Sequence, residues 1–454
     1  LLGYWGPAIA LEGNTPGAQV FNNDIFDIQD GNPNPWGIGV NIEDNTGVAT
    51  VNINNNSFKN LDYGIANAVT TTVDGTCNYW DVGVPTFAGN VNVSPYLTDG
   101  TDDMPGMIGF QSVPGSCGGL LPILNVSTGV CYPTIQLGFD FAVAGEILEI
   151  QPADYTEGSQ IVVHQDITLQ GQGKLITTLR PGFNTGSSGD SRGFILVEAG
   201  IEFHLEELTV NGLGNLVYQS IRHKGFGTVD NVRFTEIKFN ESGPNYSGVA
   251  IAAFGNGDVD VTNSMFDEIG RVGVLYFGSG ISNSLFKNNM YVGKGAGDWL
   301  DYALDISAGA GVTVEDNMIS DCIGVASSDG SSSGGILVTT YFGPGTNSTI
   351  TNNEILNNTT GIAVGFDGSD VSSVVATYNN ITGNAFGVTS TAPQVDATYN
   401  WWGDASGPSG EGFGVGDAVS TNVIFCPWLD NAWDAMPTAG LAVTGIQNLS
   451  LIHI

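Results

Sequence analysis

The chain has 454 residues, and its 65 glycines and 13% charged residues depart from an ordinary soluble domain, which has roughly 7% glycine and about 25% charged residues. Its 46 acidic and 11 basic residues give a net charge of −35, which argues against nucleic acid and anionic membranes as partners. The chain is 41% hydrophobic, enough for a large core, and no apolar run approaches the roughly 18 residues of a membrane-spanning helix.

Short apolar segments that contain asparagine recur along the chain. They are VFNNDI (20–25), INNNSF (53–58), VTNSMF (261–266), ISNSLF (281–286), VEDNMI (314–319), ITNNEI (350–355) and ATYNNI (376–381). The closest two of these segments end 286 − 266 = 20 residues apart. In several cases a glycine and a further apolar residue follow, with the apolar residue seven positions after the end of the segment, as Ile65 comes seven positions after Phe58. Units of about three short strands bury their apolar edges only by stacking. The pattern predicts an all-β fold, a right-handed parallel β-helix with three strands per coil.

The asparagines are expected at the corners between strands. Asparagine tolerates left-handed backbone angles, and its amide can bond to an asparagine stacked in the next coil. We therefore assign a structural role to Asn353, Asn379 and Asn400.

Two tryptophan segments are expected to close the stacked coils. VDGTCNYWD (73–81) aligns with VDATYNWWGD (395–404), and the glycine-rich segment after Trp402 is not expected to continue another coil. Because the end of a β-helix exposes apolar surface and strand edges, we interpret Trp80, Trp401 and Trp402 as parts of terminal caps. The alternative for the adjacent pair is a platform on which sugars stack.

The similarity between these two tryptophan segments predicts two tandem modules. The predicted segments are 1–97, the C-terminal part of a first β-helix module with its cap; 98–130, a linker; 131–429, a complete second module; 430–448, the start of a linker; and 449–454, which resembles the translation of a sequencing adapter. Ile135, Phe139 and Ala142 fall on one face of a short helix that is expected to cap the start of the second module. We expect the chain to be a piece of a longer multi-module protein.

The strand-rich opening of the second module, the asparagine coils and the NYW and NWW segments together resemble the pectin-lyase-like β-helix repeat proteins. The resemblance covers most of residues 1–429. It implies a large surface or secreted protein, located outside the cell or on its surface, with a polysaccharide or cell-surface glycan as partner. Its motifs specify the fold more than a reaction.

The five cysteines form no CxxC pair, which excludes zinc-ribbon and dithiol redox motifs. Cys117 and Cys131 are 131 − 117 = 14 residues apart. They are expected either to form a disulfide, which suits an extracellular protein, or to be unrelated buried thiols. The scattered histidines predict no histidine-rich metal site.

The predicted register limits the chemistry on the outward face of the strands that follow the glycine corners. The outward residues are Ala250, Ala252, Leu275, Phe277, Asp305, Leu337, Thr339, Ala363 and Thr389. Only Asp305 is acidic, whereas hydrolysis of a glycosidic bond generally needs two carboxylates. The Gly-His-Gly motif of polygalacturonase-like enzymes is absent.

The segment GKGAGDWLDYALDIS (293–307) is the strongest candidate site. Asp298, Asp301 and Asp305 are candidate catalytic residues, and Trp299 and Tyr302 are candidate sugar-binding residues. Carboxylate oxygens suit calcium and aromatic faces suit sugars, so calcium is the one cofactor considered. The alternative is a solvated acidic loop above a core of aliphatic residues.

These observations favour an exported cell-surface or secreted protein with a structural, adhesive or carbohydrate-binding role and no catalysis. The alternative is an enzyme that degrades or modifies a polysaccharide, as a lyase, glycoside hydrolase or epimerase. Its substrate would be a neutral glycan or a calcium-bridged uronan.

Overall fold

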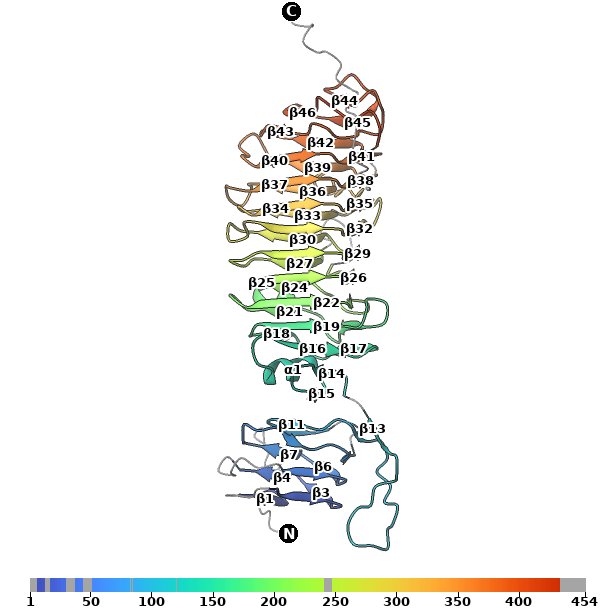
Figure 1. Cartoon of the computed structure of the whole chain (residues 1–454). Helices are drawn as coiled ribbons and strands as arrows, with labels where there is room; N and C mark the ends of the chain where they lie inside the picture. Colours follow the sequence, from blue (N-terminus) through green and yellow to red (C-terminus); the bar gives the residue numbers. More distant parts are fainter. Residues whose placement is uncertain are drawn as a thin grey trace, which may run out of the picture. The chain divides into compact units, whose positions relative to one another are not determined.

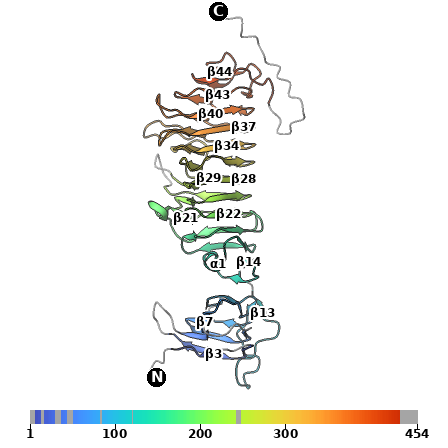
Figure 2. The ribbon, with the colours of Figure 1, turned by 60° about the vertical axis from the view of Figure 1, so that its left-hand side comes forward.

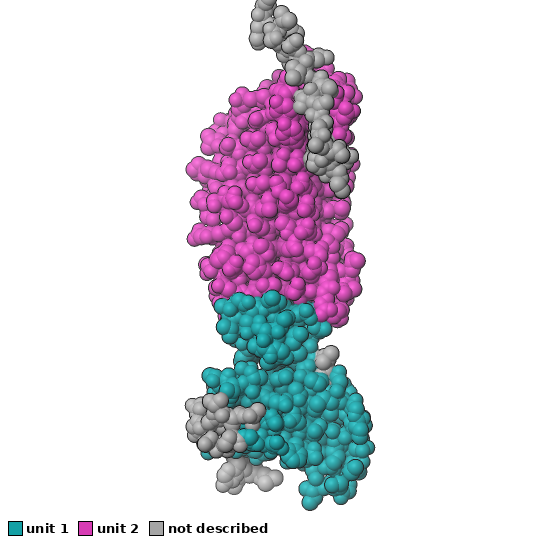
Figure 3. Space-filling view, in the orientation of Figure 1, with its two compact units in different colours: residues 1–151 teal, residues 152–454 magenta. Residues whose placement is uncertain are grey.

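The computed structural model describes residues 6–12, 17–29, 37–43, 51–81, 83, 85–119, 121–240 and 247–432. Two compact units are present, residues 1–151 and 152–454 (Figure 3). The predicted module boundary before residue 131 differs from this division and stays a prediction. From residue 433 on, the predicted second linker and the last six residues lie outside the described residues. The described part holds no helix with the length and apolar character of a membrane span.

Unit 2 consists of three parallel sheets (Figures 1 and 2). From β17 to β43, successive strands of the chain go to different sheets, so each turn adds one strand to each sheet. We name each sheet by its first strand. The β17 sheet contains β17 (Asp154–Glu157), β20 (Thr178–Pro181), β23 (Thr209–Asn211), β26 (Arg233–Ile237), β29 (Met265–Ile269), β32 (Met290–Val292), β35 (Met318–Ser320), β38 (Glu354–Leu356) and β41 (Asn380–Thr382).

The other two sheets of unit 2 are longer. The β18 sheet contains β18 (Ile161–Val163), β21 (Gly193–Val197), β24 (Gln219–His223), β27 (Val249–Ala253), β30 (Val272–Phe277), β33 (Tyr302–Ser307), β36 (Gly334–Thr339), β39 (Thr360–Val364), β42 (Phe386–Ser390), β45 (Gly416–Val419) and β44 (Pro408–Gly410). Within unit 2 the β19 sheet contains β19 (Ile167–Gln170), β22 (Glu202–Glu206), β25 (Phe226–Asp230), β28 (Val259–Thr262), β31 (Ser284–Lys287), β34 (Gly311–Glu315), β37 (Asn347–Thr351), β40 (Ser373–Thr377), β43 (Val395–Asp396) and β46 (Val423–Ile424). A short 3-10 helix, η1 (Gly189–Arg192), precedes β21.

The core lies inside the coil, where alternate residues of each strand stack on their equivalents in the next rung. Ile319, Ile355 and Ile381 pair in register across the β17 sheet and are fully buried. Neighbouring residues of each strand point to opposite faces, so a rung can bury one set of side chains and expose the other. The predicted all-β parallel β-helix is confirmed.

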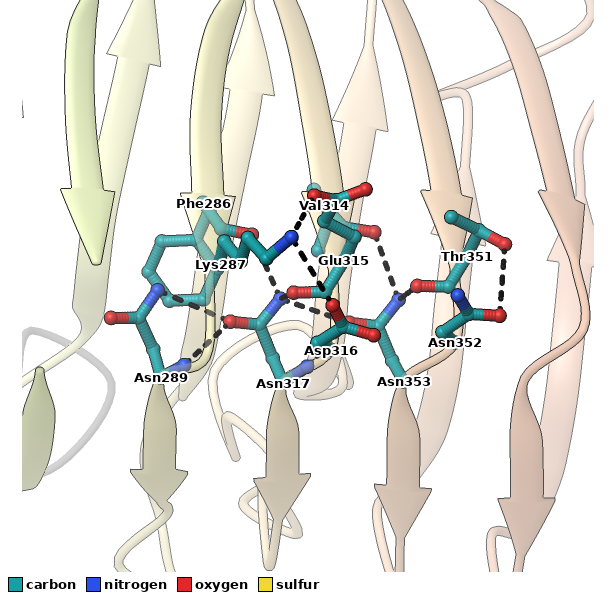
Figure 4. A network of polar contacts seen from close by, with 10 residues as sticks. All are labelled: Phe286, Lys287, Asn289, Val314, Glu315, Asp316, Asn317, Thr351, Asn352 and Asn353. Atoms are coloured by element: carbon teal, nitrogen blue, oxygen red, sulfur yellow. Dashed lines mark hydrogen bonds and ion pairs between the residues drawn. The ribbon is translucent and has the colours of Figure 1, made fainter. Parts of the chain in front are cut away.

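A ladder of asparagines fixes one corner of unit 2. Asn289, Asn317, Asn353, Asn379 and Asn400 are buried, and the amide nitrogen of each of the first four donates to Oδ1 of the next asparagine at 2.9 to 3.1 Å. Figure 4 shows the first three members of this ladder. The residue just before each has a φ between 56° and 59°; these residues are Asn288, Asp316, Asn352, Tyr378 and Tyr399. The left-handed conformation therefore belongs to the preceding residue, and the ladder asparagine supplies only the hydrogen bonds.

Unit 1 repeats the same arrangement on a smaller number of rungs. The β1 sheet contains β1 (Ile9–Leu11), β4 (Ile38–Ile42), β7 (Tyr63–Asn67) and β10 (Phe87–Ala88); the β2 sheet contains β2 (Gln19–Phe21), β5 (Asn52–Asn54), β8 (Val73–Asp74) and β11 (Val91–Asn92); and the β3 sheet contains β3 (Asp24–Ile28), β6 (Ser57–Leu61) and β9 (Tyr79–Trp80). All three are parallel, and Asn23, Asn56 and Asn78 form their own ladder.

The rest of unit 1 is antiparallel or helical. β12 (Tyr96–Leu97) pairs with β13 (Cys117–Gly119), and β14 (Ile123–Asn125) pairs with both β15 (Cys131–Tyr132) and β16 (Glu146–Ile150). The expected helix is present as α1 (Ile135–Phe141), with Thr134 as its N-cap, and it buries Ile135 and Phe139. Its role as a cap of the second module stays a prediction.

The predicted disulfide between Cys117 and Cys131 is wrong. Cys117 is bonded to Cys77, with a Cα–Cα distance of 5.2 Å, and Cys131 is a free, partly buried thiol. The cause is the return of the chain along unit 1: β13 pairs with β12, and the backbone nitrogen of Phe110 donates to the carbonyl of Asn22. Much of the predicted linker 98–130 is therefore packed on the first rungs, where Cys77 occupies a corner.

The tryptophans of the two similar segments, 73–81 and 395–404, occupy equivalent positions inside their units. Trp80 and Trp402 are buried, and each faces a glycine of an adjacent strand. A Cβ added to Gly64 would lie 2.7 Å from Trp80 Nε1, and one added to Gly387 would lie 3.0 Å from Trp402 Cζ3. The indoles thus occupy interior space that only glycine leaves open.

The chain continues past Trp402, contrary to expectation. β45 pairs with β42 and β46 pairs with β43, so two of the three sheets of unit 2 gain a further strand. The glycine-rich segment between Trp402 and β45 includes β44, and the register of the β18 sheet shifts there, between Phe386 and Val388 of β42 and between Pro408 and Ser409 of β44. Trp402 is fully buried and offers no face to a sugar, whereas Trp401 is partly exposed.

Candidate functional site

A cleft of about 540 Å³ opens on the outward side of the β18 sheet. Its lining residues are Arg271, Val272, Tyr302, Asp305, Ser331, Ser332, Leu337, Thr339, Tyr341, Phe342, Gly365 and Phe366. The parallel register places Asp305 between Leu275 of β30 and Leu337 of β36, in the outward row described from the sequence. We call this site the β33 cleft.

Asp305 is the carboxylate in the lining of the β33 cleft. Its Oδ1 is buried and accepts no hydrogen bond in the described part of the chain. Burial raises the pKa of Asp305 to about 6, while the Ser307 hydroxyl and the Arg271 guanidinium act in the opposite direction. The group can therefore change its protonation state near neutral pH.

Arg271 differs from the other basic residues of the chain. Ten of the eleven have an ion pair, a hydrogen bond or an aromatic ring as side-chain partner: Lys59, Lys174, Arg180, Arg192, Arg222, Lys224, Arg233, Lys238, Lys287 and Lys294. The Arg271 guanidinium makes no ion pair or hydrogen bond with any residue the structure describes, although it is partly exposed and lines the β33 cleft. It is available for an anionic ligand.

A row of aromatic rings runs along the same side of unit 2. Phe254, Phe277, Phe342, Tyr341 and Phe366 are joined by ring-centroid distances of 5.3, 5.3, 4.8 and 5.1 Å. Each lies at or just after the end of a strand of the β18 sheet, and the strands concerned are β27, β30, β36 and β39. Tyr341 and Phe342 are 62% and 61% exposed. We call these five residues the aromatic row.

The structure brings only two of the five predicted site residues into the cleft, Asp305 and Tyr302. Tyr302 donates its hydroxyl to the carbonyl of Ser332 at 3.1 Å. Asp298 lies outside and accepts hydrogen bonds from the backbone and side chain of Ser327. Trp299 also lies outside, with its indole nitrogen bonded to the carbonyl of Gly295.

Asp301 is a structural carboxylate. It is fully buried, accepts a hydrogen bond from the Tyr291 hydroxyl, and forms an ion pair with Lys294 at 3.0 Å. The three predicted aspartates therefore do not converge, and among the described residues no three His, Cys, Asp or Glu side chains gather into a metal site. Calcium stays a prediction without a ligand set in this part of the chain.

Sequence reasoning missed Arg271 and the exposed part of the aromatic row. The available signal was local: Tyr341 and Phe342 follow the last residues of a strand and precede the turn glycine Gly343, where burial in the coil is not expected. Arg271 stands directly before β30, at a position that the periodic pattern leaves unassigned.

The fold and the cleft define a right-handed parallel β-helix protein. Residues 220–401 match the family described as "Right handed beta helix region". A search of curated proteins found no match.

Among solved structures, the chain is similar to the periplasmic alginate epimerase AlgG, with 15% identity, a TM-score of 0.35, and coverage of 56% of this chain and 65% of that one. It is also similar to a variant of the alginate lyase AlyGC, with 13% identity, a TM-score of 0.37, and coverage of 91% and 58%. The pectin methylesterase PemA from Erwinia chrysanthemi gives 10% identity, a TM-score of 0.28, and coverage of 56% and 87%. The chain thus spans less than two thirds of the epimerase and the lyase, and likeness at these values carries no activity over.

Proposed function

We propose that the chain is an exported surface or secreted β-helix protein that binds an extended glycan along the aromatic row. The observation that carries the proposal is the run of partly exposed rings from the rungs of β27, β30, β36 and β39, of which Tyr341, Phe342 and Phe366 also line the β33 cleft. Aromatic faces pack against the apolar faces of sugars, and contiguous exposed apolar patches mark binding surfaces. A glycan bound in this way lies along the coil axis and contacts several rungs.

The bound glycan carries a carboxylate. In a chain with a net charge of −35, Arg271 is the basic side chain left without an ion pair or hydrogen bond in the described residues, and it lies in the β33 cleft. A guanidinium presents two parallel donors that fit a carboxylate. We assign Arg271 to an acidic sugar unit and the aromatic row to the units on either side.

Export is supported by the Cys77–Cys117 disulfide. Disulfides persist in oxidising compartments and are rare in the cytosol. A rigid stack of rungs that displays one glycan surface suits an adhesive or anchoring role at the cell surface.

Binding of acidic and neutral oligosaccharides in solution, measured by calorimetry, tests the proposal. Tyr341→Ala and Arg271→Ala should each weaken binding of the acidic ligand about tenfold, which is about 1.4 kcal/mol. Phe413→Ala is the matched control, because Phe413 is 103% exposed and belongs to neither the aromatic row nor the cleft. Equal affinities of Tyr341→Ala and the unmodified chain would contradict the proposal.

A second candidate function is lyase or epimerase chemistry on the same acidic glycan. It is favoured by one observation, the raised pKa of Asp305 beside Arg271 and Tyr302, since a general base works best with a pKa near the working pH. Hydrolysis fits less well, because Asp305 is the single carboxylate in the lining of the β33 cleft.

Incubation with acidic oligosaccharides separates the two functions. Pure binding predicts no new products by mass spectrometry and no ultraviolet absorbance from unsaturated sugar ends, with or without calcium. Product formation that Asp305→Asn abolishes, with binding retained, would establish the enzyme instead.

A further inference from the structure

A second cleft, in unit 1, has a lining without any charged side chain. Its volume is about 370 Å³, and it is lined by Gln19, Phe21, Asn22, Asn52, Asn54 and Asn55. These residues come from β2 and β5 and the corner after each strand. We call this cleft the amide groove.

The parallel register builds the amide groove from stacked pairs. Gln19 pairs with Asn52 and Phe21 pairs with Asn54. At the corner, the backbone nitrogen of Asn22 donates to the carbonyl of Asn55 at 3.2 Å. The positions of the lining residues are therefore fixed by backbone pairing between rungs and not by contacts among their side chains.

Most of the amides in the groove have unused hydrogen-bonding capacity. The side chains of Gln19, Asn22 and Asn52 form no hydrogen bond with any residue that the structure describes, and all three are partly or largely exposed. Asn54 uses its nitrogen on Thr76, at 3.0 and 3.1 Å, which leaves its Oδ1 as an acceptor. Each free amide offers two donors and an acceptor.

Phe21 adds an apolar face to this polar lining. It is 57% exposed and sits at the same register as Asn54. Sites for small polar ligands combine an apolar surface with a few placed hydrogen-bonding groups, and aromatic faces pack on sugar rings. A sugar hydroxyl both donates and accepts, as an amide does. An anionic ligand finds no Lys or Arg in this lining.

We propose that the amide groove is a binding site for a neutral saccharide, separate from the β33 cleft. Phe21 stacks on a sugar ring, while Gln19 and Asn52 bond to its hydroxyl groups. The proposal does not depend on the function of unit 2, because it uses other residues and a ligand of different charge.

Calorimetry on the full chain tests this site with a panel of neutral hexasaccharides built from glucose, mannose, galactose or xylose. At least one should bind, and Phe21→Ala and Asn52→Ala should each weaken its binding at least tenfold. Phe26→Ala is the matched control: Phe26 is 55% exposed, lies on β3 of the same unit and does not line the groove, so it should change affinity less than twofold. Circular dichroism confirms that the variants are folded.

The panel also separates this site from the proposed function. Tyr341→Ala should leave neutral saccharide binding unchanged, and Phe21→Ala should leave acidic glycan binding unchanged. The proposal is overturned if no neutral hexasaccharide binds, or if binding survives Phe21→Ala. It is equally overturned if Tyr341→Ala alone removes the binding, which would assign the saccharide to unit 2.

Discussion

The buried carboxylate oxygen of Asp305 lowers the stability of the fold and at the same time offers an acceptor to a ligand in the β33 cleft. Its neighbours along the β18 sheet are Leu275 and Leu337, and its Oδ1 has no hydrogen-bond donor in the described part of the chain. A carboxylate oxygen that loses water without gaining a donor destabilises the charged form of the group. Nearby Arg271 lowers the cost but does not form an ion pair with it. A ligand that donates hydroxyl groups to Asp305 would supply the missing hydrogen bonds.

Replacing Asp305 by asparagine should therefore stabilise unit 2 near neutral pH. The folded pKa of about 6 lies above the ordinary value of 3.8, so the carboxyl is favourable below pH 3.8 and its contribution is lost as the pH rises through 6. The loss is about 2 kcal/mol once partial solvent access is allowed for.

Denaturant unfolding of Asp305→Asn and the unmodified chain at acidic and alkaline pH measures this difference. The stability of the variant relative to the unmodified chain should increase as the pH rises from 4 to 8, because only the unmodified chain carries the titrating carboxyl. Asp298→Asn, at an exposed position, should show no such gain. A variant that is less stable than the unmodified chain at pH 8 would mean that Asp305 is a structural residue.

The corners of the coil depend on the asparagine ladder. Asn353 accepts hydrogen bonds at Oδ1 from the backbone nitrogen and the side chain of Asn317, and donates from Nδ2 to Val314, Thr351 and Asn379 (Figure 4). Each ladder member thus satisfies backbone groups of two rungs at once. Unmade hydrogen bonds of buried groups cost about 1–3 kcal/mol each, so the ladder is a cooperative element.

Asn353→Ala should destabilise unit 2 by about 3 kcal/mol, because it leaves buried backbone groups on both sides without partners. Asn352→Gly is the control next in sequence: Asn352 has a φ of 59°, which glycine adopts without strain, and it lies outside the ladder. This control should change the free energy of unfolding by less than about 0.5 kcal/mol. Equal effects of the two substitutions in urea unfolding would refute the role of the ladder.

The repeating parts of the fold could be predicted from the sequence. Residues such as Ile355 and Ile381 recur at intervals set by the coil, and a period fixes which residues stack, so the β-helix and the outward place of Asp305 followed from spacing alone. Ladder asparagines are repeated for the same reason.

The inserted parts could not be predicted in this way. Asp298 and Asp301 lie in a loop whose path is set by contacts with Ser327 and Lys294, and no period relates those residues. The pairing of Cys77 with Cys117 likewise depends on how residues after β12 fold back. Spacing in sequence carries no information on contacts that cross rungs through loops of unequal length.

The net charge of the chain affects the stability of the whole fold. With 46 acidic and 11 basic residues, most acidic side chains have no cation to pair with, and the net charge of −35 destabilises the compact chain through self-repulsion. Surface ion pairs contribute little to stability, typically below about 1 kcal/mol each. Added salt should therefore weaken the repulsion among the acidic side chains more than it weakens the ion pairs. The fold should be more stable in salt than at low ionic strength.

Raising sodium chloride from about 10 mM to about 0.5 M shortens the screening length from about 30 Å to about 4 Å and should raise the melting temperature by several degrees. Potassium and choline chlorides should act equally, since screening does not distinguish the cations. A melting temperature that falls with salt would show that the ion pairs dominate. Calcium at constant ionic strength should add nothing further, because no three His, Cys, Asp or Glu side chains gather among the described residues. A rise in melting temperature at micromolar calcium would mean that the chain binds the ion.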